Sequence, residues 1–376
     1  MANANLSKAK TAKQDEFYTQ YADIEKEVNA YLEYRPDTFR DKIVLLPCDD
    51  PEWSNFTRYF ALHFEDLGLR RLVSTSYAPE SKKLKMPLQL SLFETESPQF
   101  DPAKTQTHGK IFVLDRDVDG NGRIDIDDLQ WHYLEGDGDF RSKEITALRD
   151  DADIIVTNPP FSLFREFFGW IMEGEKDFLI IGNMNAVTYK EVFPCFKDNL
   201  VWYGCTINSG DREFGVPDAY PLDASGWRID EEGKKFIRVK GVRWFTNLDH
   251  GRRHQPLSLM TMADNLKFSK HKELKGKDSY DHYDNYDAIE VPFTDAIPSD
   301  YDGAMGVPIT FLDKYCPEQF DIIDIAKRGP GKWETRSKIY TAEDYPNYND
   351  LNATPVIIED GVPRNTYPRI LIRKKQ

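Results

Sequence analysis

The strongest guide to the fold is a pair of predicted short strands with a helical segment between them. Ile43–Leu46 and Arg71–Ser76 have the composition of buried strands, and residues 54–67 have a helical pattern that stops at Gly68. A strand, a helix and a strand within about thirty residues predict a βαβ unit, whose two strands run parallel. The chain is therefore expected to contain an α/β domain.

The same alternation returns later in the chain. Strands are predicted over 152–156 and 177–181, with an apolar helix over 163–172 between them and a helical lead-in over 23–34. The stretch from about 78 to 138 is looser, has one clear strand at 110–114, and is interpreted as an insertion. Beyond residue 205 the elements become short and aromatic. We therefore predict a domain over 1–204 with a mostly parallel sheet, and a second lobe of mixed α/β structure over 205–376.

Composition limits the class of protein. The chain has 376 residues, 40% of them hydrophobic, which is enough to bury a large core. It has no apolar run near the ~18 residues that a membrane span needs. Its four cysteines form no CxxC pair, which favours a reducing cytoplasm over a disulfide scaffold. The net charge of −15 argues against non-specific binding to polyanions, although a local basic groove stays compatible with it.

The residues that point to chemistry are Asn158-Pro159-Pro160-Phe161, directly after a predicted buried strand. The amino group of adenine is a poor nucleophile because its lone pair is delocalised into the ring. An asparagine oxygen and a backbone carbonyl that both accept from this group would localise the lone pair. The prolines stiffen the turn, and Phe161 supplies a stacking face worth roughly 1–3 kcal/mol. The motif therefore favours methyl transfer to an exocyclic or amide nitrogen. The alternative interpretation is an ordinary turn after a strand.

The turn after the first strand, residues 49–56, lacks the glycine-rich pattern of a dinucleotide site. Its acids Asp49 and Asp50 are predicted to bind the ammonium group or the ribose hydroxyls of S-adenosylmethionine. Ser54 and Asn55 are candidates for the same site, and capping of the next helix is their alternative role.

A second candidate for the cofactor site is the loop Gly136–Phe140, which contains Asp139 and Phe140. It is predicted to reach the adenine ring of S-adenosylmethionine. An ordinary acidic loop is the alternative.

With these residues in place, the chain resembles the EcoRI-type adenine-specific DNA methyltransferases over most of its length. The matching stretches keep their order along the chain: Ala9–Lys13, Asp15–Gln20, Cys48–Pro51, Ser54–Phe56, Ala152–Phe164, Ile180–Ala186, Trp244, Thr246–Leu248, Tyr283–Ile289 and Gly303–Leu312. The resemblance implies a Rossmann-like S-adenosylmethionine-dependent methyltransferase domain followed by a C-terminal target-recognition lobe.

The resemblance also implies an activity and its residues. The activity is methylation of adenine N6 in double-stranded DNA, with the base flipped out, by a modification enzyme that works with a restriction endonuclease or as an orphan. Residues 13–19 then help to hold the cofactor, and the residues carried over are Lys13, Phe17, Tyr18, Thr19, Asp49, Asp50, Asp139, Asn158, Pro159 and Phe161. Enzymes of this type can act as monomers, so the resemblance is compatible with a monomeric chain. The alternatives are an amino-methyltransferase that acts on RNA or a protein glutamine, and a non-catalytic DNA-binding relative.

Within the predicted insertion, residues 117–128 follow the pattern of a twelve-residue calcium loop. The predicted ligands are Asp117, Asp119, Asn121, the backbone carbonyl of Arg123, Asp125 and Asp128. Position 12 is aspartate instead of glutamate, as in dockerin-type loops, and a solvated acidic turn is the alternative. Methyl transfer needs no metal, so a calcium ion here is predicted to be structural.

The densest basic stretch of the second lobe supplies the candidates for DNA binding. They are Arg252, Arg253, Lys267 and Lys270. Contacts to phosphates and a solvated charged face are the two interpretations of such a run. Tyr280, Tyr283 and Tyr286 have helical spacing, and both core packing and base stacking fit that pattern.

Overall fold

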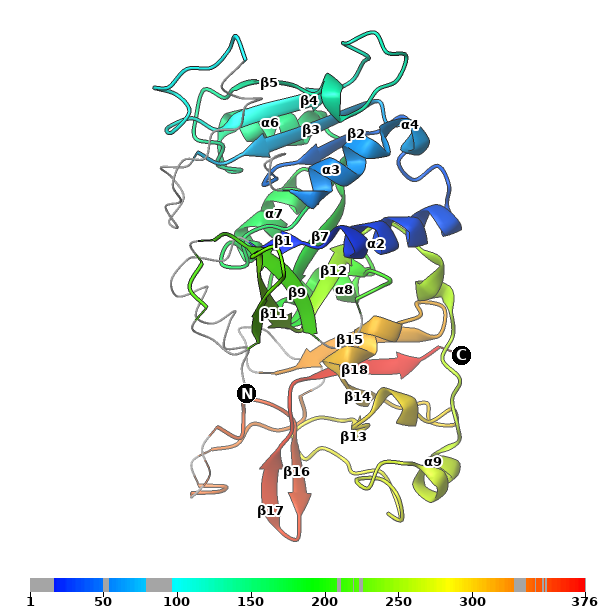
Figure 1. Cartoon of the computed structure of the whole chain (residues 1–376). Coiled ribbons are helices and arrows are strands. Elements are labelled where there is room, and N and C mark those ends of the chain that lie inside the picture. The colour runs from blue at the N-terminus through cyan, green and yellow to red at the C-terminus, as the bar shows by residue number, and fades with distance from the viewer. Residues whose placement is uncertain are drawn as a thin grey trace. The chain divides into compact units, whose positions relative to one another are not determined.

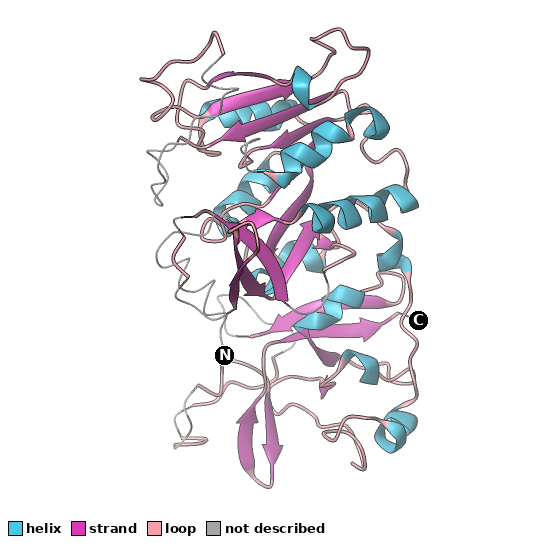
Figure 2. Cartoon of the chain, in the orientation of Figure 1, coloured by secondary structure: helices cyan, strands magenta, loops and turns pink. Residues whose placement is uncertain are grey.

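The computed structural model describes residues 17–49, 54–78, 97–207, 211–218, 220–222, 226–327, 336–341, 343–346, 348 and 350–375. The chain is a mixed α/β protein with several sheets (Figures 1 and 2). It divides into two compact units. Unit 1 consists of residues 1–186 and 203–250, and unit 2 consists of residues 187–202 and 251–376.

An eight-stranded sheet organises unit 1 (Figure 1). Its order is β5 (Gln130–Tyr133), β4 (Lys110–Leu114), β3 (Arg71–Ser76), β2 (Ile43–Leu46), β6 (Ile154–Thr157), β7 (Asp177–Asn183), β12 (Val242–Thr246) and β8 (Trp202–Tyr203). The four central strands β3, β2, β6 and β7 run parallel to one another. The pairs β5–β4, β4–β3 and β7–β12 are antiparallel. The sheet is therefore parallel at its centre and antiparallel toward both edges.

Helices cover both faces of this sheet. They are α2 (Tyr21–Tyr34), α3 (Asn55–Leu62), α4 (Phe64–Leu67), α6 (Lys143–Asp151) and α7 (Phe164–Glu173), with 3-10 turns η2 (Ile126–Asp128) and η3 (Met184–Thr188). On β12, Trp244 contacts Phe56 of α3, whereas the next residue, Phe245, contacts Phe164 of α7. Neighbouring residues of a strand point to opposite faces, so α3 and α7 lie on opposite sides of the sheet.

The predicted elements around the central strands are confirmed. β2 consists of four buried apolar residues, and β3, β6 and β7 lie within two residues of the predicted limits. The helix expected over 54–67 is interrupted at His63, which separates α3 from α4. Gly68 ends α4 with a φ of +63°, in the left-handed region that favours glycine.

A buried carboxyl group connects α2 to the chain that follows β8. Glu27 is 0% exposed and accepts hydrogen bonds from the Tyr31 hydroxyl (2.9 Å), the Cys205 amide (2.7 Å) and the Thr206 amide (2.8 Å) and hydroxyl (2.5 Å). Burial raises the pKa of Glu27, and these hydrogen bonds oppose that rise. These four hydrogen bonds hold α2 and residues 205–206 in one arrangement.

A second, four-stranded sheet of unit 1 contains the N-terminal strand. Its order is β1 (Tyr18–Thr19), β9 (Asp211–Val216), β11 (Lys235–Lys240) and β10 (Trp227–Ile229). All three pairings are antiparallel.

Unit 2 is built on a four-stranded sheet and a separate hairpin. The sheet has the order β13 (Ile289–Glu290), β14 (Met305–Pro308), β18 (Arg369–Lys374) and β15 (Phe320–Ala326), and the hairpin pairs β16 (Val356–Glu359) with β17 (Val362–Asn365). The helices are α8 (Phe193–Lys197) and α9 (Met262–Phe268), with 3-10 turns η4 (Gly251–His254), η5 (Thr294–Ala296) and η6 (Ile309–Lys314). Tyr280, Tyr283 and Tyr286 are all at most 5% exposed and lie outside any helix, so they belong to the core.

The division into units differs from the predicted boundary after residue 204. Residues 203–250 belong to unit 1, because β12 pairs along β7 and β9 pairs with β1. The predicted insertion is also part of the main sheet, since β4 and β5 extend its edge. Among the described residues, no helix has both the length and the apolar character to cross a membrane.

Candidate active site

The site begins where the strand order of the main sheet reverses. β2 lies between β3 and β6, so the chain goes from β2 to one side and later returns to the other. In α/β sheets, ligands bind in the crevice beyond the carboxyl ends of the strands at such a reversal. Asp49 follows β2 and Asn158 follows β6. Both predicted site residues therefore lie at this reversal of the strand order.

Asn158 is fixed through one end of its amide, while the other end lacks a partner. Its Nδ2 donates a 2.6 Å hydrogen bond to the carbonyl oxygen of Phe17. Its Oδ1 is buried and accepts no hydrogen bond from the described part of the chain. A buried acceptor left in this state costs about 1–3 kcal/mol, which is why such atoms are rare outside functional sites. Oδ1 is therefore an oriented acceptor available to a donor from a ligand.

The prolines and Phe161 form the turn between β6 and α7. The Leu163 amide donates to the Pro160 carbonyl at 2.9 Å, which closes the turn. The Phe161 ring is 2% exposed and lies 5.6 Å from the Phe17 ring and 6.4 Å from the Phe214 ring, between centroids. Tyr220 joins the same aromatic cluster through Phe17, at 6.2 Å. In this structure Phe161 is thus packed among aromatic rings and has no open face for stacking.

Asp49 connects the turn after β2 to the strand that carries the motif. It is 6% exposed, and its Oδ1 accepts from the Ser54 hydroxyl and its Oδ2 from the Thr157 hydroxyl, both at 2.6 Å. Ser74 and Thr57 donate to its backbone carbonyl. The carboxylate therefore links residues on three elements and fixes the residue that precedes Asn158.

Ser54 has the capping role that was its alternative, whereas Asn55 makes a contact that was not predicted. The Ser54 hydroxyl accepts from the Phe56 amide at 3.1 Å and caps α3. Asn55 Nδ2 donates to the Thr19 carbonyl at 2.7 Å, so α3 also holds the N-terminal strand. The Thr19 hydroxyl is buried and has no hydrogen-bond partner in the described part of the chain. Tyr18 is half-buried beside it in β1. Lys13 and Asp50, also predicted for the cofactor, lie outside the described residues.

The loop Gly136–Phe140 packs against the carboxyl end of β3. A Cβ on Gly138, whose φ is +86°, would lie 2.3 Å from the Ser76 carbonyl oxygen, so only glycine fits this approach. Asp139 Oδ1 accepts from Nε of Arg141 at 2.9 Å, and its Oδ2 from Nη2 at 2.6 Å. These hydrogen bonds hold the pKa of Asp139 below its usual range, against the opposing effect of burial.

Phe140 has a structural position in this loop. Its ring is 5% exposed and lies 5.1 Å from Phe167 and 5.7 Å from Trp170 of α7. The structure thus brings Asp139 to the same edge of the sheet as Asp49 and Asn158, and it buries Phe140 against α7.

The acidic loop at 117–128 brings together half of the predicted calcium ligands. Oxygen atoms of Asp117, Asp119 and Asp128 lie within 4.8 Å of one another. Asp128 is buried, and backbone hydrogen bonds, chiefly from Val118, hold its pKa below the usual value. Asp125 instead caps η2.

Asn121 and Arg123 have local partners in the same loop. Asn121 Oδ1 accepts from the Arg123 amide at 2.8 Å. The side chains of both residues are exposed.

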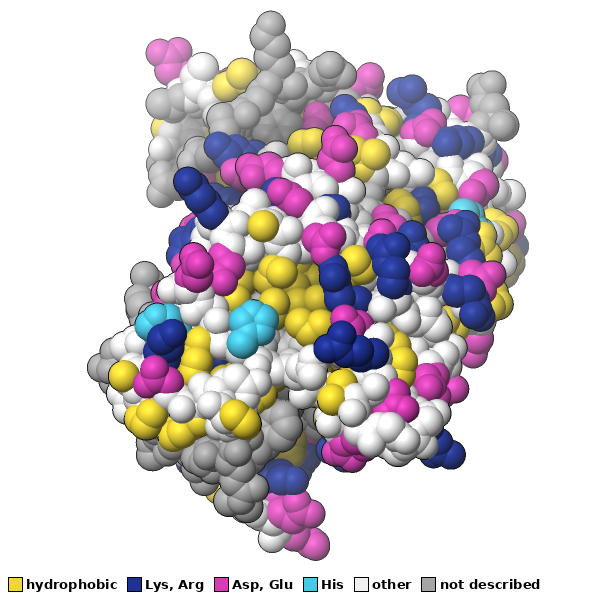
Figure 3. Space-filling model, turned by 90° about the horizontal axis from the view of Figure 1, so that it is seen from above, with side chains coloured by type: hydrophobic (Ala, Val, Ile, Leu, Met, Phe, Trp, Pro, Cys, Tyr) yellow, Lys and Arg dark blue, Asp and Glu magenta, His cyan; other side chains and the backbone are white. Residues whose placement is uncertain are grey.

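The four basic candidates differ in how available their charges are. Arg253 is 8% exposed, and its guanidinium carbon lies 3.5 Å from the centre of the Trp202 ring. Its guanidinium group also donates to Asn199 Oδ1 at 2.5 Å, so this group is engaged in contacts within the protein. Arg252 is half-buried in η4. Lys267 and Lys270 are exposed at the end of α9, where Lys270 pairs with Asp295 at 2.8 Å. On the face drawn in Figure 3, basic and acidic side chains are interspersed.

Three residues of the site were absent from the predictions. Thr157 donates to the Asp49 carboxylate, Phe214 packs on Phe161, and Tyr220 joins the same cluster through Phe17. Thr157 had a signal, because it is the polar residue between a buried strand and Asn158. Phe214 and Tyr220 had none, because they come from a segment that was assigned to the second lobe.

Known proteins resemble this chain over most of its length. The sequence pattern of the family described as "Adenine-specific methyltransferase EcoRI" matches residues 5–375. The chain is 42% identical to the Type II methyltransferase M.EcoRI of Escherichia coli, over 86% of this chain and 90% of that protein. It is 32% identical to the Type II methyltransferase M.MpnI of Mycoplasma pneumoniae, over 99% of this chain and 98% of that protein. No solved structure matches the chain. An Asn-Pro-Pro-Phe turn at the reversal of an α/β sheet and a match over nearly the whole chain lead to one conclusion: this protein belongs to the EcoRI family of adenine-specific methyltransferases.

Proposed function

We propose that this chain methylates N6 of adenine at defined sites in double-stranded DNA, with S-adenosylmethionine as the methyl donor. The observation that carries the proposal is the oriented Oδ1 of Asn158 at the end of β6, which accepts no hydrogen bond from the residues that the structure describes. Membership of the adenine-specific family supplies the substrate class.

The chemistry follows from the two acceptors of the motif. Asn158 Oδ1 and the Pro159 carbonyl accept hydrogen bonds from the amino group of the target adenine. The nitrogen becomes tetrahedral as it takes the methyl group from the sulfonium donor, whose carbon–sulfur bond breaks as the new bond forms. Both acceptors then face the developing positive charge of the nitrogen, which is removed when the nitrogen gives up one proton. No covalent intermediate with the protein is needed. Rate enhancement comes from positioning and from these fixed dipoles.

The residues at the sheet edge fit S-adenosylmethionine, which would supply an electrophilic methyl group when bound. The cofactor presents ammonium and hydroxyl donors, so its site needs acceptors and small polar groups. The buried Thr19 hydroxyl lacks a partner in the described part of the chain, and Asp139 supplies a carboxylate whose pKa stays low. We assign Thr19, Tyr18 and Asp139 to this site, together with Lys13 and Asp50. Asp49, Ser54 and Phe17 support it through the contacts described above.

The buried motif also supports base flipping. An adenine stacked inside a duplex cannot reach an acceptor that is inaccessible to solvent, so the base must leave the helix. Phe161 would then stack on it, after the aromatic cluster with Phe17 and Phe214 opens. The opening replaces ring–ring contacts by base–ring contacts of similar strength.

Several finer assignments accompany this proposal. A Rossmann-like methyltransferase domain fits the doubly covered sheet of unit 1, and target recognition is assigned to unit 2. A partner restriction endonuclease, a monomeric state and a cytoplasmic location stay predictions. A structural calcium ion at residues 117–128 also stays a prediction, supported by the grouping of Asp117, Asp119 and Asp128.

The deciding experiment is transfer of tritiated methyl groups from S-adenosylmethionine to unmethylated duplex DNA, with nucleoside analysis of the product. We expect N6-methyladenine, and sequencing of the same DNA for modified positions should give one short target site. RNA and protein substrates serve as parallel acceptors. Incorporation only into RNA or into protein glutamine would replace the proposal by one of those activities. No incorporation, together with no heat of cofactor binding, would indicate a non-catalytic relative.

A further inference from the structure

The hairpin of unit 2 has the form of a short twisted ribbon. β16 and β17 form a sheet of their own, with pairs from Val356–Asn365 at the base to Glu359–Val362 at the tip. Asp360 and Gly361 at the tip have φ angles of +51° and +80°. Positive φ at both central residues is the feature of a type I′ turn, whose twist matches that of the paired strands.

The base of this hairpin is held firmly. Asn285, which is 0% exposed, accepts from the Val356 amide at 2.8 Å and donates to the Thr354 carbonyl at 3.1 Å. On the other strand, the Thr366 amide donates to the Pro355 carbonyl at 2.8 Å. A ribbon fixed at its base loses little conformational entropy when its tip binds a partner.

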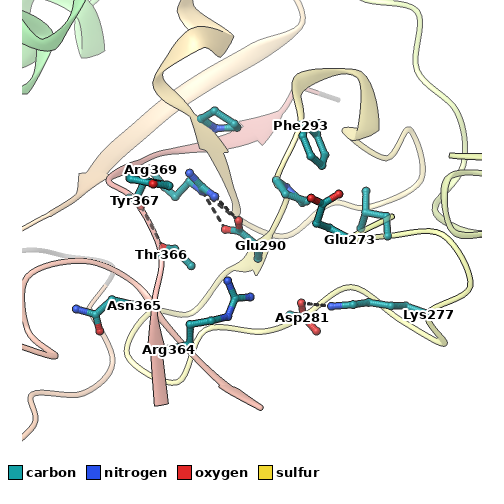
Figure 4. Close-up of a pocket in the computed structure, with 13 residues that line it drawn as sticks. Glu273, Lys277, Asp281, Glu290, Phe293, Arg364, Asn365, Thr366, Tyr367 and Arg369 are labelled. Atoms are coloured by element: carbon teal, nitrogen blue, oxygen red, sulfur yellow. Dashed lines mark hydrogen bonds and ion pairs between the residues drawn. The ribbon is translucent and has the colours of Figure 1, made fainter. Parts of the chain in front are cut away.

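A cavity of about 420 Å³ lies beside the base of the hairpin, with Arg364–Tyr367 on one side and Lys277, Asp281 and Glu290 on the other (Figure 4). Glu290 and Arg369 pair at its floor, where Arg369 Nε lies 3.0 Å from Oε2 and the two side chains are 7% and 10% exposed. Breaking such a buried pair would leave an uncompensated charge. Arg369 therefore stabilises the fold and is not available to bind a ligand.

Arg364 is the available arginine at this cavity. It donates to Glu359 at 2.8 Å and 3.2 Å, but the two side chains are 55% and 49% exposed. An exposed pair of this kind is worth only about 0–1 kcal/mol, so either partner can exchange it for a ligand at little cost. Beyond Arg364, Tyr367 is 81% exposed, so a large aromatic ring stands uncovered on the same segment.

We propose that this hairpin enters the major groove of the DNA and that Arg364 and Glu359 recognise one G·C pair of the target site. The inference rests on the proposed function. The major groove admits a two-stranded ribbon, and an arginine fork matches the O6 and N7 acceptors of guanine while a glutamate accepts from the amino group of cytosine. Arg364 and Glu359 contact each other across the hairpin, so they can face the two bases of one pair.

The experiment compares the wild type with Arg364→Ala, Arg364→Lys and Glu359→Ala. The matched control is Arg40→Ala, which also removes an exposed arginine paired to an exposed carboxylate, but at the start of β2, away from the carboxyl ends of the strands. For each variant, kcat/KM is measured on the cognate duplex and on duplexes with one base pair changed, and methylated positions are mapped in genomic DNA.

We expect the Arg364→Ala variant to lose roughly 5- to 150-fold in kcat/KM on the cognate duplex, the range of one bidentate base contact. The Glu359→Ala variant should lose discrimination at the same base pair. The Arg364→Lys variant keeps the charge but lacks the fork, so it should bind DNA and still fail to discriminate at that pair. Circular dichroism and cofactor affinity should stay at wild-type values in all variants.

Two results would overturn the inference while the proposed function stands. One is a wild-type target site without a G·C pair, and the other is an Arg364→Ala variant with the rate and site preference of the Arg40→Ala control. If the wild type transfers no methyl group to DNA, the proposed function itself fails and this inference fails with it.

Discussion

At the scale of single residues, the proposed chemistry uses two acceptors, and Asn158 Oδ1 is the one that a side-chain substitution can remove. Asn158 Oδ1 is buried, fixed by the bond from Nδ2 to Phe17 and lacks a partner in the described part of the chain. Replacing Asn158 by alanine removes this acceptor, so we expect kcat for methyl transfer to fall by about 10²–10³-fold or more. S-adenosylmethionine should still bind, as measured by calorimetry. Loss of cofactor binding in this variant would contradict the role assigned to Asn158.

Thr157 gives a test of how the motif is positioned. Its hydroxyl donates to the buried carboxylate of Asp49, so Thr157→Val leaves that oxygen short of a donor while keeping the side-chain shape. We expect the free energy of unfolding to fall by about 1–3 kcal/mol. We also expect kcat to fall with little change in KM for DNA, because Asn158 follows directly in the chain. Thr157→Ser keeps the hydroxyl and should restore kcat; a kcat unaffected by Thr157→Val would show that the bond serves stability alone.

The sequence indicated Asn158 and Phe161 because local order marks them, but it did not indicate the partners of Asp49. Thr157 is distant in sequence and reaches Asp49 only because β2 and β6 become neighbours in the sheet. The same limit applies to Phe161, which was predicted to offer a stacking face. Its enclosing rings, Phe17 and Phe214, come from two other parts of the chain, so its burial has no local signal.

At the scale of elements, the buried parallel strands were predictable, whereas the antiparallel pairing at the edges of the sheet was not. A run such as Ile43–Leu46 is apolar on both faces, which only a central strand requires. β12 has the same character over Val242–Thr246, but its partner β7 lies far upstream and no short connection indicates the pairing. The predicted boundary after residue 204 therefore placed β12 in the second lobe, whereas it extends the main sheet.

The loop of residues 117–128 can be tested as an element on its own. If calcium binds there, it stabilises the folded state by RT ln(1 + [Ca²⁺]/Kd), which is about 2.7 kcal/mol at a hundredfold excess over Kd. We expect calcium to raise the melting temperature of the wild type, and the Asp119→Ala variant to lack this rise. Methyl transfer at a temperature well below melting should be insensitive to a chelator, because the reaction needs no metal. An unchanged melting temperature with calcium would indicate a solvated acidic turn.

At the scale of the whole molecule, the charge of −15 has to be reconciled with a DNA substrate. Acidic and basic side chains are interspersed on the face in Figure 3, so that face presents no uniformly basic surface to a duplex. Each phosphate contact releases counterions, and the acidic remainder of the surface repels the duplex at low salt. Binding should therefore weaken as salt concentration rises, with a slope set by the number of phosphate contacts.

Lys267 and Lys270 allow this balance to be measured, because both are exposed, whereas Arg253 is packed on Trp202. Replacing both lysines by alanine should lower the slope of log K against log salt by about two, one for each phosphate contact. Affinity should fall to a similar degree for cognate and unrelated duplexes, because phosphates carry no sequence information. The control pair is Lys190 and Lys234, which are exposed and paired to Glu191 and Glu232. An equal slope for both double variants would remove Lys267 and Lys270 from the DNA interface and leave the hairpin of unit 2 as its main candidate.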